Sequence, residues 1–119
     1  MARIIFYEKP GSVTSKRQKA LLVGSGHQVE THNLLTEPWS PSSLRPYFGA
    51  LPVRDWFDAA SPRLASGEIN PEDVTPQEAM VMMMLDPSLI RHPLMRVGDH
   101  CEAGFDVDAI TEWVGLTSQ

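Results

Sequence analysis

The stretch Tyr7-Glu8-Lys9-Pro10-Gly11-Ser12-Val13-Thr14-Ser15 joins an apolar run, Ile4-Ile5-Phe6, to a segment with helical spacing at residues 18–23. A strand that turns through Pro-Gly into a helix brings its loop residues close to the helix start. The amide groups there carry partial positive charge and favour an anion or a thiolate. The sequence therefore predicts a binding site formed by Gly11, Ser12, Val13, Thr14 and Ser15, with Ser12 as its most suggestive position.

The composition suits a small globular domain. The chain has 119 residues, of which 42% are hydrophobic and 21% are charged, as in ordinary soluble proteins. A net charge of -5 and a pI near 5.2 argue against binding nucleic acid or an anionic membrane through bulk electrostatics. No window approaches about 18 uninterrupted apolar residues, so we expect no membrane span.

The only cysteine, Cys101, excludes an intramolecular disulfide and a multi-cysteine metal site. We interpret it as a small apolar filler, with a glutathionylated or metal-binding thiol as the alternative. His27, His32 and His100 lack paired ligand spacing on one helix, so no metal is expected. The N-terminal residues enter a strand at once and leave no room for a signal peptide, which predicts a cytoplasmic protein.

The first third of the chain predicts a β-α-β unit. A strand at residues 3–7 precedes a helix from about Val13 to Gly24, and a second strand follows at residues 27–34. Such a unit implies two parallel strands with a right-handed crossover.

Prolines break up the middle of the chain and predict a helical insertion at about residues 40–90. Ser40-Pro41 and Leu51-Pro52 each open a short helix, the first over residues 42–48, whereas residues 61–71 are expected to form a loop. Thr75-Pro76-Gln77-Glu78 forms a capping box for a helix that ends before Pro87.

The methionines of that helix have two interpretations. Helical spacing favours a core position for Met80, Met83, Met84 and nearby Leu85, and it leaves Met82 as the most exposed. The alternative is a surface that binds a partner, because methionine adapts to varied surfaces.

The last third predicts a strand at residues 94–97, a Gly98-Asp99 turn, a returning strand at residues 100–103, and a helix capped by Asp106 that extends to about Leu116. This order, a β-α-β unit followed by an insertion, a β-hairpin and a closing helix, resembles the thioredoxin fold. We therefore predict an α/β protein with a mixed four-stranded sheet, folded as a single domain over residues 1–119.

The residues also resemble one family of that fold, the glutaredoxin-linked arsenate reductases and Spx-like proteins. The likeness rests on Tyr7-(x)2-Pro10-Gly11-Ser12-Val13-Thr14-Ser15, on Leu89-Ile90-Arg91-His92-Pro93-Leu94 and on Gly104-Phe105. The narrower branch of nitrogenase-associated proteins, found in nitrogen-fixing bacteria, is similar at Arg17-Gln18-Lys19-Ala20-Leu21-Leu22, Leu35-Thr36-Glu37-Pro38-Trp39 and residues 105–116. The resemblance covers essentially the whole chain.

The resemblance implies that Ser12 stands where the family has its nucleophilic cysteine, with Ser15 completing a Cys-x-x-Ser pattern. A helix start lowers the pKa of a thiol, but it does not ionise a serine hydroxyl, which also forms no disulfide. To act as a nucleophile Ser12 would need a neighbouring base, for which Lys9 and Glu8 are candidates by sequence proximity. A helix cap or an anion ligand is the favoured role.

The family's oxyanion-binding arginines are not matched either. The one before the strand proline corresponds to His92, and Arg91 is displaced by one position, which points its side chain to the other side. The other two fall near Asp58 and Ala103. With the nucleophile and the cationic clamps both absent, the sequence argues against arsenate reduction.

The His92-Pro93 pair is expected, by the resemblance, to contain a cis peptide that faces the Ser12 loop. It would present backbone groups of residue 92 to a bound peptide or thiol, so Arg91, His92 and Pro93 join the predicted binding residues. The alternative for His92 is a partly buried, hydrogen-bonded histidine.

Three functional hypotheses remain open. The first is a non-catalytic binding or regulatory protein linked to nitrogen fixation or related metabolism, with a protein partner, no cofactor and no direct contact with nucleic acid. The second is a glutathione-dependent oxidoreductase that is active through other residues, or in which Ser12 is an engineered replacement for cysteine. The third is a structural subunit that has kept only the fold.

Overall fold

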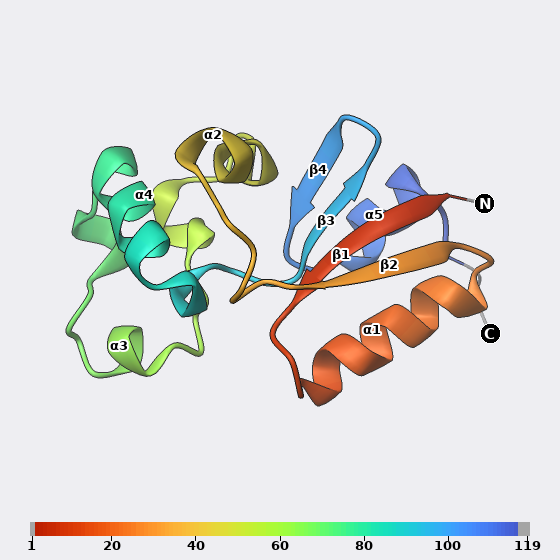
Figure 1. The fold of residues 1–119 in the computed structure, drawn as a ribbon, viewed down its shortest axis with the longest axis horizontal. Coiled ribbons are helices and arrows are strands. Elements are labelled where there is room, and N and C mark those ends of the chain that lie inside the picture. Colours follow the sequence, from red (N-terminus) through yellow and green to blue (C-terminus); the bar gives the residue numbers. More distant parts are fainter. Residues whose placement is uncertain (1, 117–119) are drawn as a thin grey trace.

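The computed structural model describes residues 2–116 and contains a mixed four-stranded sheet in the order β2-β1-β3-β4 (Figure 1). Strand β1 (Arg3–Glu8) pairs in parallel with β2 (Gln28–Asn33) and antiparallel with β3 (Leu94–Val97). Strand β4 (His100–Ala103) returns antiparallel to β3. The predicted thioredoxin-like α/β fold is confirmed.

The two faces of the sheet carry separate hydrophobic clusters. Alternate residues of β1 point to opposite faces, so Ile4 and Phe6 pack with α1 (Val13–Gly24) and α5 (Val107–Trp113). Tyr7 faces the other way and joins the larger cluster under the helical insertion. The insertion is therefore packed against the sheet through shared core residues.

Short helices make up the insertion. They are α2 (Pro41–Leu44), the 3₁₀ helices η1 (Arg45–Phe48) and η2 (Val53–Trp56), α3 (Pro62–Ala65), the 3₁₀ helix η3 (Pro71–Asp73), α4 (Pro76–Leu85) and the 3₁₀ helix η4 (Pro87–Leu89). The capping box at the start of α4 is confirmed: the Thr75 hydroxyl accepts from the Glu78 backbone N–H, and the Glu78 carboxylate accepts from the Thr75 backbone N–H.

Three predicted elements differ from the structure. The expected loop at residues 61–71 contains α3, which starts with a Ser61 cap and Pro62, the same signal that opens α2. The helix predicted over residues 42–48 changes to 3₁₀ geometry at η1, because Pro46 lacks the N–H that an α-helix would require. The last helix ends at Trp113, close to Gly115, which has a φ of +85°.

Two side chains of α4 are placed differently from the prediction. Leu85 was expected in the core but is exposed to solvent, and Met82 was expected to be the most exposed but packs partly against the core. The core covers the stripe formed by Ala79, Met80 and Met83. Leu85 lies about 140° around the helix from Met80 and so faces outward.

Candidate functional site

Ser12 is the N-cap of α1. Its hydroxyl oxygen accepts a hydrogen bond from the backbone N–H of Ser15 at 3.2 Å, which satisfies one of the free donors at the helix start. Gly11 precedes it with a φ of +84°, the left-handed conformation that favours glycine at this turn. Val13 and Thr14 are exposed, whereas Ser15 is buried and its hydroxyl has no hydrogen-bond partner within residues 2–116. The predicted capping role of Ser12 is confirmed.

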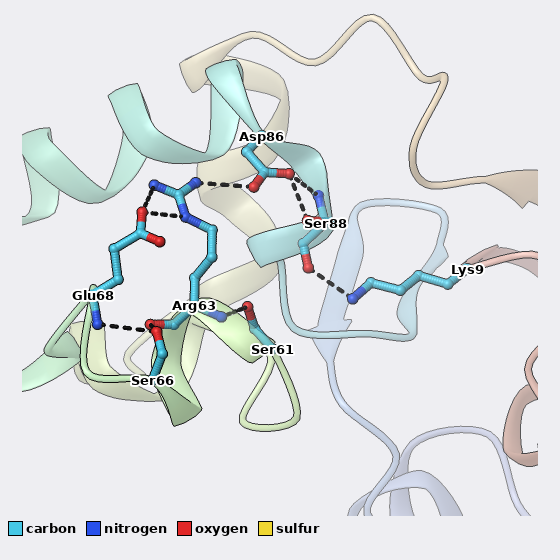
Figure 2. Close-up of polar contacts among 7 residues, drawn as sticks. All are labelled: Lys9, Ser61, Arg63, Ser66, Glu68, Asp86 and Ser88. Atoms are coloured by element: carbon cyan, nitrogen blue, oxygen red, sulfur yellow. Dashed lines mark hydrogen bonds and ion pairs between the residues drawn. The ribbon is translucent and has the colours of Figure 1, made fainter.

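The two candidate bases beside Ser12 are both engaged elsewhere. The Lys9 ammonium contacts the Asp58 carboxylate at 2.5 Å and donates to the backbone carbonyl of Ser88 at 2.7 Å. Figure 2 shows the Lys9 side chain reaching from the β1–α1 loop towards Ser88 of η4. Glu8 forms an ion pair with Lys19 of α1. Neither residue is therefore free to take a proton from Ser12.

The peptide bond between His92 and Pro93 is cis, as predicted. The His92 side chain is largely buried, and its Nδ1 lies 3.6 Å from Oδ2 of Asp58, too far for a hydrogen bond. Burial lowers the pKa of His92, the nearby Lys9 charge adds to this effect, and the Asp58 charge opposes it. At neutral pH the imidazole is therefore uncharged.

Asp58 supplies a negative charge where the resemblance would place an arginine. Burial alone would raise its pKa, but the hydrogen bond from Lys9 and the backbone N–H of Ala60 together hold the pKa below its usual range. The cluster of Lys9, Asp58 and His92 therefore contains one cation, one carboxylate and one neutral ring. This balance does not favour an oxyanion.

Arg91 lies away from this cluster. Its Nη1 donates to the backbone carbonyl of Asp55 at 3.3 Å, and its guanidinium packs over Gly104, where a Cβ atom would come within 2.5 Å of Nε. It lines a groove between the η1–η2 connection and β4, whereas His92 turns towards Asp58. This divergence agrees with the one-residue shift in the sequence.

The structure separates two of the predicted binding residues, Arg91 and His92, and it places His92 near Lys9, a candidate base outside the predicted binding set. Lys9 and His92 meet Asp58, while Arg91 belongs to a different groove. The role of Asp58 as the shared partner was not apparent from the sequence, since it lies 49 residues from Lys9 and no local motif links the two.

Cys101 lies in β4 and packs partly against the core under the insertion, as a filler would. Burial raises the pKa of its thiol, which favours the protonated form at neutral pH. Among residues 2–116 no group of three or more His, Cys, Asp or Glu could hold a metal ion. Within the same residues no helix has the length and apolarity to cross a membrane.

The lowered pKa of His92 predicts a pH dependence of stability. The unfolded chain, with a histidine pKa near 6.5, binds this proton more readily than the folded chain does. The contribution of His92 to the free energy of unfolding is therefore complete above about pH 6.5 and is lost as the pH falls through the folded pKa. Urea unfolding of the original chain and of the His92→Gln variant, each at about pH 7.5 and about pH 5, measures this contribution.

The difference in stability between the two pH values should be smaller in His92→Gln than in the original chain. An equal difference in both proteins would contradict the lowered pKa.

Comparison with known proteins identifies relatives over nearly the full chain. No protein family model matches it. A Rhodospirillum rubrum protein described as an uncharacterized 15.7 kDa protein in the draG 3' region is 48% identical over 119 residues, which are 100% of this chain and 83% of that protein. The global transcriptional regulator Spx of Lactiplantibacillus plantarum is 24% identical over 113 residues, covering 93% of this chain and 86% of the regulator.

Solved structures show the same fold. A putative ArsC family related protein from Bacteroides fragilis superposes with a TM-score of 0.80 at 15% identity, covering 92% of this chain and 97% of that one. An arsenate reductase from Vibrio cholerae gives a TM-score of 0.76 at 18% identity, covering 93% and 97% of the two chains.

Proposed function

We propose a non-catalytic binding or regulatory role for this chain, which belongs to the arsenate reductase and Spx-like family of the thioredoxin fold. The observation that carries the proposal is the state of Ser12, whose hydroxyl caps α1 while both neighbouring bases are held in ion pairs. A serine held in this way lacks the base that a hydroxyl nucleophile requires.

The chemistry of the family explains why a serine at the position of the nucleophilic cysteine matters. The resemblance implies a thiolate that attacks arsenate and then forms a mixed disulfide with glutathione. A helix start can bring a thiol pKa down from about 8.5 into the physiological range, but a hydroxyl remains protonated there. The carboxylate of Asp58 further opposes an anionic substrate near His92.

The relatives suggest the setting. The R. rubrum relative is described by its position in the draG 3' region, which is nitrogenase-associated, and this supports a role linked to nitrogen fixation or related metabolism. The Spx relative is described as a global transcriptional regulator, which supports a regulatory role for this chain. The protein partner is part of our proposal. We place the protein in the cytoplasm and assign it no cofactor.

The alternative is a glutathione-dependent oxidoreductase that is active through other residues, or in which Ser12 is an engineered replacement for cysteine. In the chain as it stands, the thiol available for this chemistry is Cys101. The raised pKa of this half-buried thiol counts against that activity, because the thiolate is the reactive form.

A substitution at Ser12 tests the proposal directly. The original chain is expected to be inert towards arsenate and towards oxidised glutathione. In a Cys101→Ser background, the Ser12→Cys thiolate should attack a sulfur of oxidised glutathione, form a mixed disulfide and release one glutathione thiol. We expect this without arsenate reduction, because the cationic clamp is absent. Mass spectrometry measures the adduct, and thiol-coupled turnover measures arsenate reduction.

Ser25→Cys in the same background is the matched control. Ser25 caps the opposite end of α1, where the helix dipole disfavours a thiolate. The adduct should form at least about tenfold faster at residue 12 than at residue 25 near neutral pH. Turnover by the original chain would refute the non-catalytic role, and its loss in Cys101→Ser would assign the activity to Cys101.

A further inference from the structure

Helix α4 exposes large apolar side chains on the outer side of the insertion. Val81 and Leu85, one helical turn apart, are 59% and 82% exposed. With Met80, Met84, Gln77 and Pro41 of α2 they line an open, almost entirely apolar groove, called here the α4 groove. Figure 1 shows α4 at the side of the insertion that faces away from the sheet.

This part of the chain also carries its excess negative charge. Residues 64–90 contain no Lys or Arg, whereas the acidic and basic residues elsewhere in the chain balance. The five carboxylates of the segment are Glu68, Glu72, Asp73, Glu78 and Asp86. Within residues 2–116, Arg63 pairs with Glu68 and Asp86 (Figure 2), and the other three form no ion pair. Glu78 itself lines the flank of α4 beside Val81 and Met82.

The sign of this charge selects among the possible occupants of the groove. A second copy of the chain would bring one acidic segment against another, and an anionic lipid surface would be repelled in the same way. A partner with basic residues would be attracted. The exposed pair at positions i and i+4 and the adaptable methionine side chains suit the apolar face of a helix.

We propose that the α4 groove binds an amphipathic helix of a partner protein, in which Lys or Arg residues flank the apolar face. Val81 and Leu85 supply exposed apolar contacts, Met80 and Met84 line the floor, and Glu78 faces the basic flank of the helix. This surface is separate from the cluster of Lys9, Asp58 and His92, so the proposal holds or fails independently of the role of Ser12.

The test uses two synthetic helical peptides of about 18 residues, one built from Leu and Lys and the other from Leu and Glu in the same amphipathic pattern. Each is titrated into the full chain, with calorimetry for affinity and methionine-methyl NMR for location. The Leu/Lys peptide should bind, shift the Met80 and Met84 signals, and weaken as salt is raised. The Leu/Glu peptide should not bind.

Matched substitutions separate the groove from general charge attraction. Val81→Lys should weaken binding of the Leu/Lys peptide at least about tenfold. Val23→Lys makes the same charge change at an α1 valine that is 58% exposed, and it should leave the affinity within about twofold. Glu78→Gln should reduce the salt dependence while preserving the capping box, which also accepts glutamine. Circular dichroism confirms that each variant is folded.

Several results would overturn the proposal. Equal weakening by the two valine substitutions would mean unspecific attraction, and no binding of the Leu/Lys peptide would exclude the proposed occupant. Equal binding of both peptides would contradict the charge argument. Self-association that Val81→Lys abolishes and Val23→Lys preserves would make a second copy the occupant.

Discussion

Trp56→Ala is expected to lower the free energy of unfolding by about 3–5 kcal/mol, as typical for a large aromatic side chain removed from a core. The indole is almost completely buried and stacks on Phe48 with a centroid distance of 4.9 Å and an interplanar angle of 6°. The guanidinium of Arg45 lies 4.7 Å from the ring centroid, and the indole Nε1 donates to the Leu51 carbonyl at 2.8 Å. Alanine would leave a cavity at the centre of the insertion.

Trp56→Phe provides the control for this substitution. Phenylalanine keeps an aromatic ring for stacking on Phe48, but it removes the donor to the Leu51 carbonyl and should cost about 1–3 kcal/mol. Equal losses for the two variants would show that the lost hydrogen bond, rather than the cavity, determines the effect. Urea unfolding measures both.

The same measurement tests whether the chain folds as one unit. The core under the insertion includes Tyr7 and Leu94 from the sheet together with Trp56. Loss of Trp56 should therefore move one cooperative transition for the whole chain. Circular dichroism and tryptophan fluorescence, which reports on Trp39 at the core under the insertion and on Trp113 at the α1–α5 face, should give the same midpoint. Two separate transitions would contradict the prediction of a single domain.

Features of this fold that were predictable from the sequence have local signals. Ser12 and Thr75 are followed three residues later by the N–H groups they cap, and Gly98-Asp99 forms a two-residue turn between β3 and β4. The short helix α3 has the same kind of Ser-Pro start at Ser61, but it spans only four residues and lies in a stretch with many turn-forming residues. A local signal was present there and was outweighed by composition.

Tertiary relations were less predictable. Helical spacing in α4 indicated an apolar face, but seven consecutive apolar residues at positions 79–85 do not reveal which of them the core covers. This is why Leu85 and Met82 were misassigned. Similarly, alternation along an extended segment correctly separated Arg91 from His92, whereas the partner of His92 lies in a distant part of the insertion.

Asp58, which lies beside His92, gives the second large effect: Asp58→Ala is expected to lower the free energy of unfolding by roughly 2–3 kcal/mol. Breaking a fully buried ion pair costs about 3–5 kcal/mol because one charge stays uncompensated. The Lys9 and Asp58 side chains are 22% and 12% exposed, so water screens part of this loss. Without Asp58, the Lys9 ammonium would still donate a hydrogen bond to the Ser88 carbonyl, but it would lie beside His92 with no counter-ion.

A double-mutant cycle isolates the pair. The double variant Lys9→Met/Asp58→Leu should lose less free energy of unfolding than the two single variants lose in sum. We expect a coupling of about 1–2 kcal/mol, because removing both charges leaves neither of them uncompensated. Glu68→Ala is the control, since it removes a carboxylate from the more exposed Arg63 ion pair and should cost about 0.5 kcal/mol or less. Equal costs for Asp58→Ala and Glu68→Ala would contradict a special role for Asp58.

An NMR titration of His92 in Asp58→Ala provides an independent readout of the same cluster. The Asp58 charge raises the pKa of His92, whereas burial and Lys9 lower it. Removing the carboxylate should therefore lower the His92 pKa further, because Lys9 then acts without opposition. A His92 pKa that rises in this variant would contradict this account of the cluster, because the Asp58 charge acts on His92 more strongly than the Lys9 charge, and its loss lowers the pKa even where Lys9 moves away.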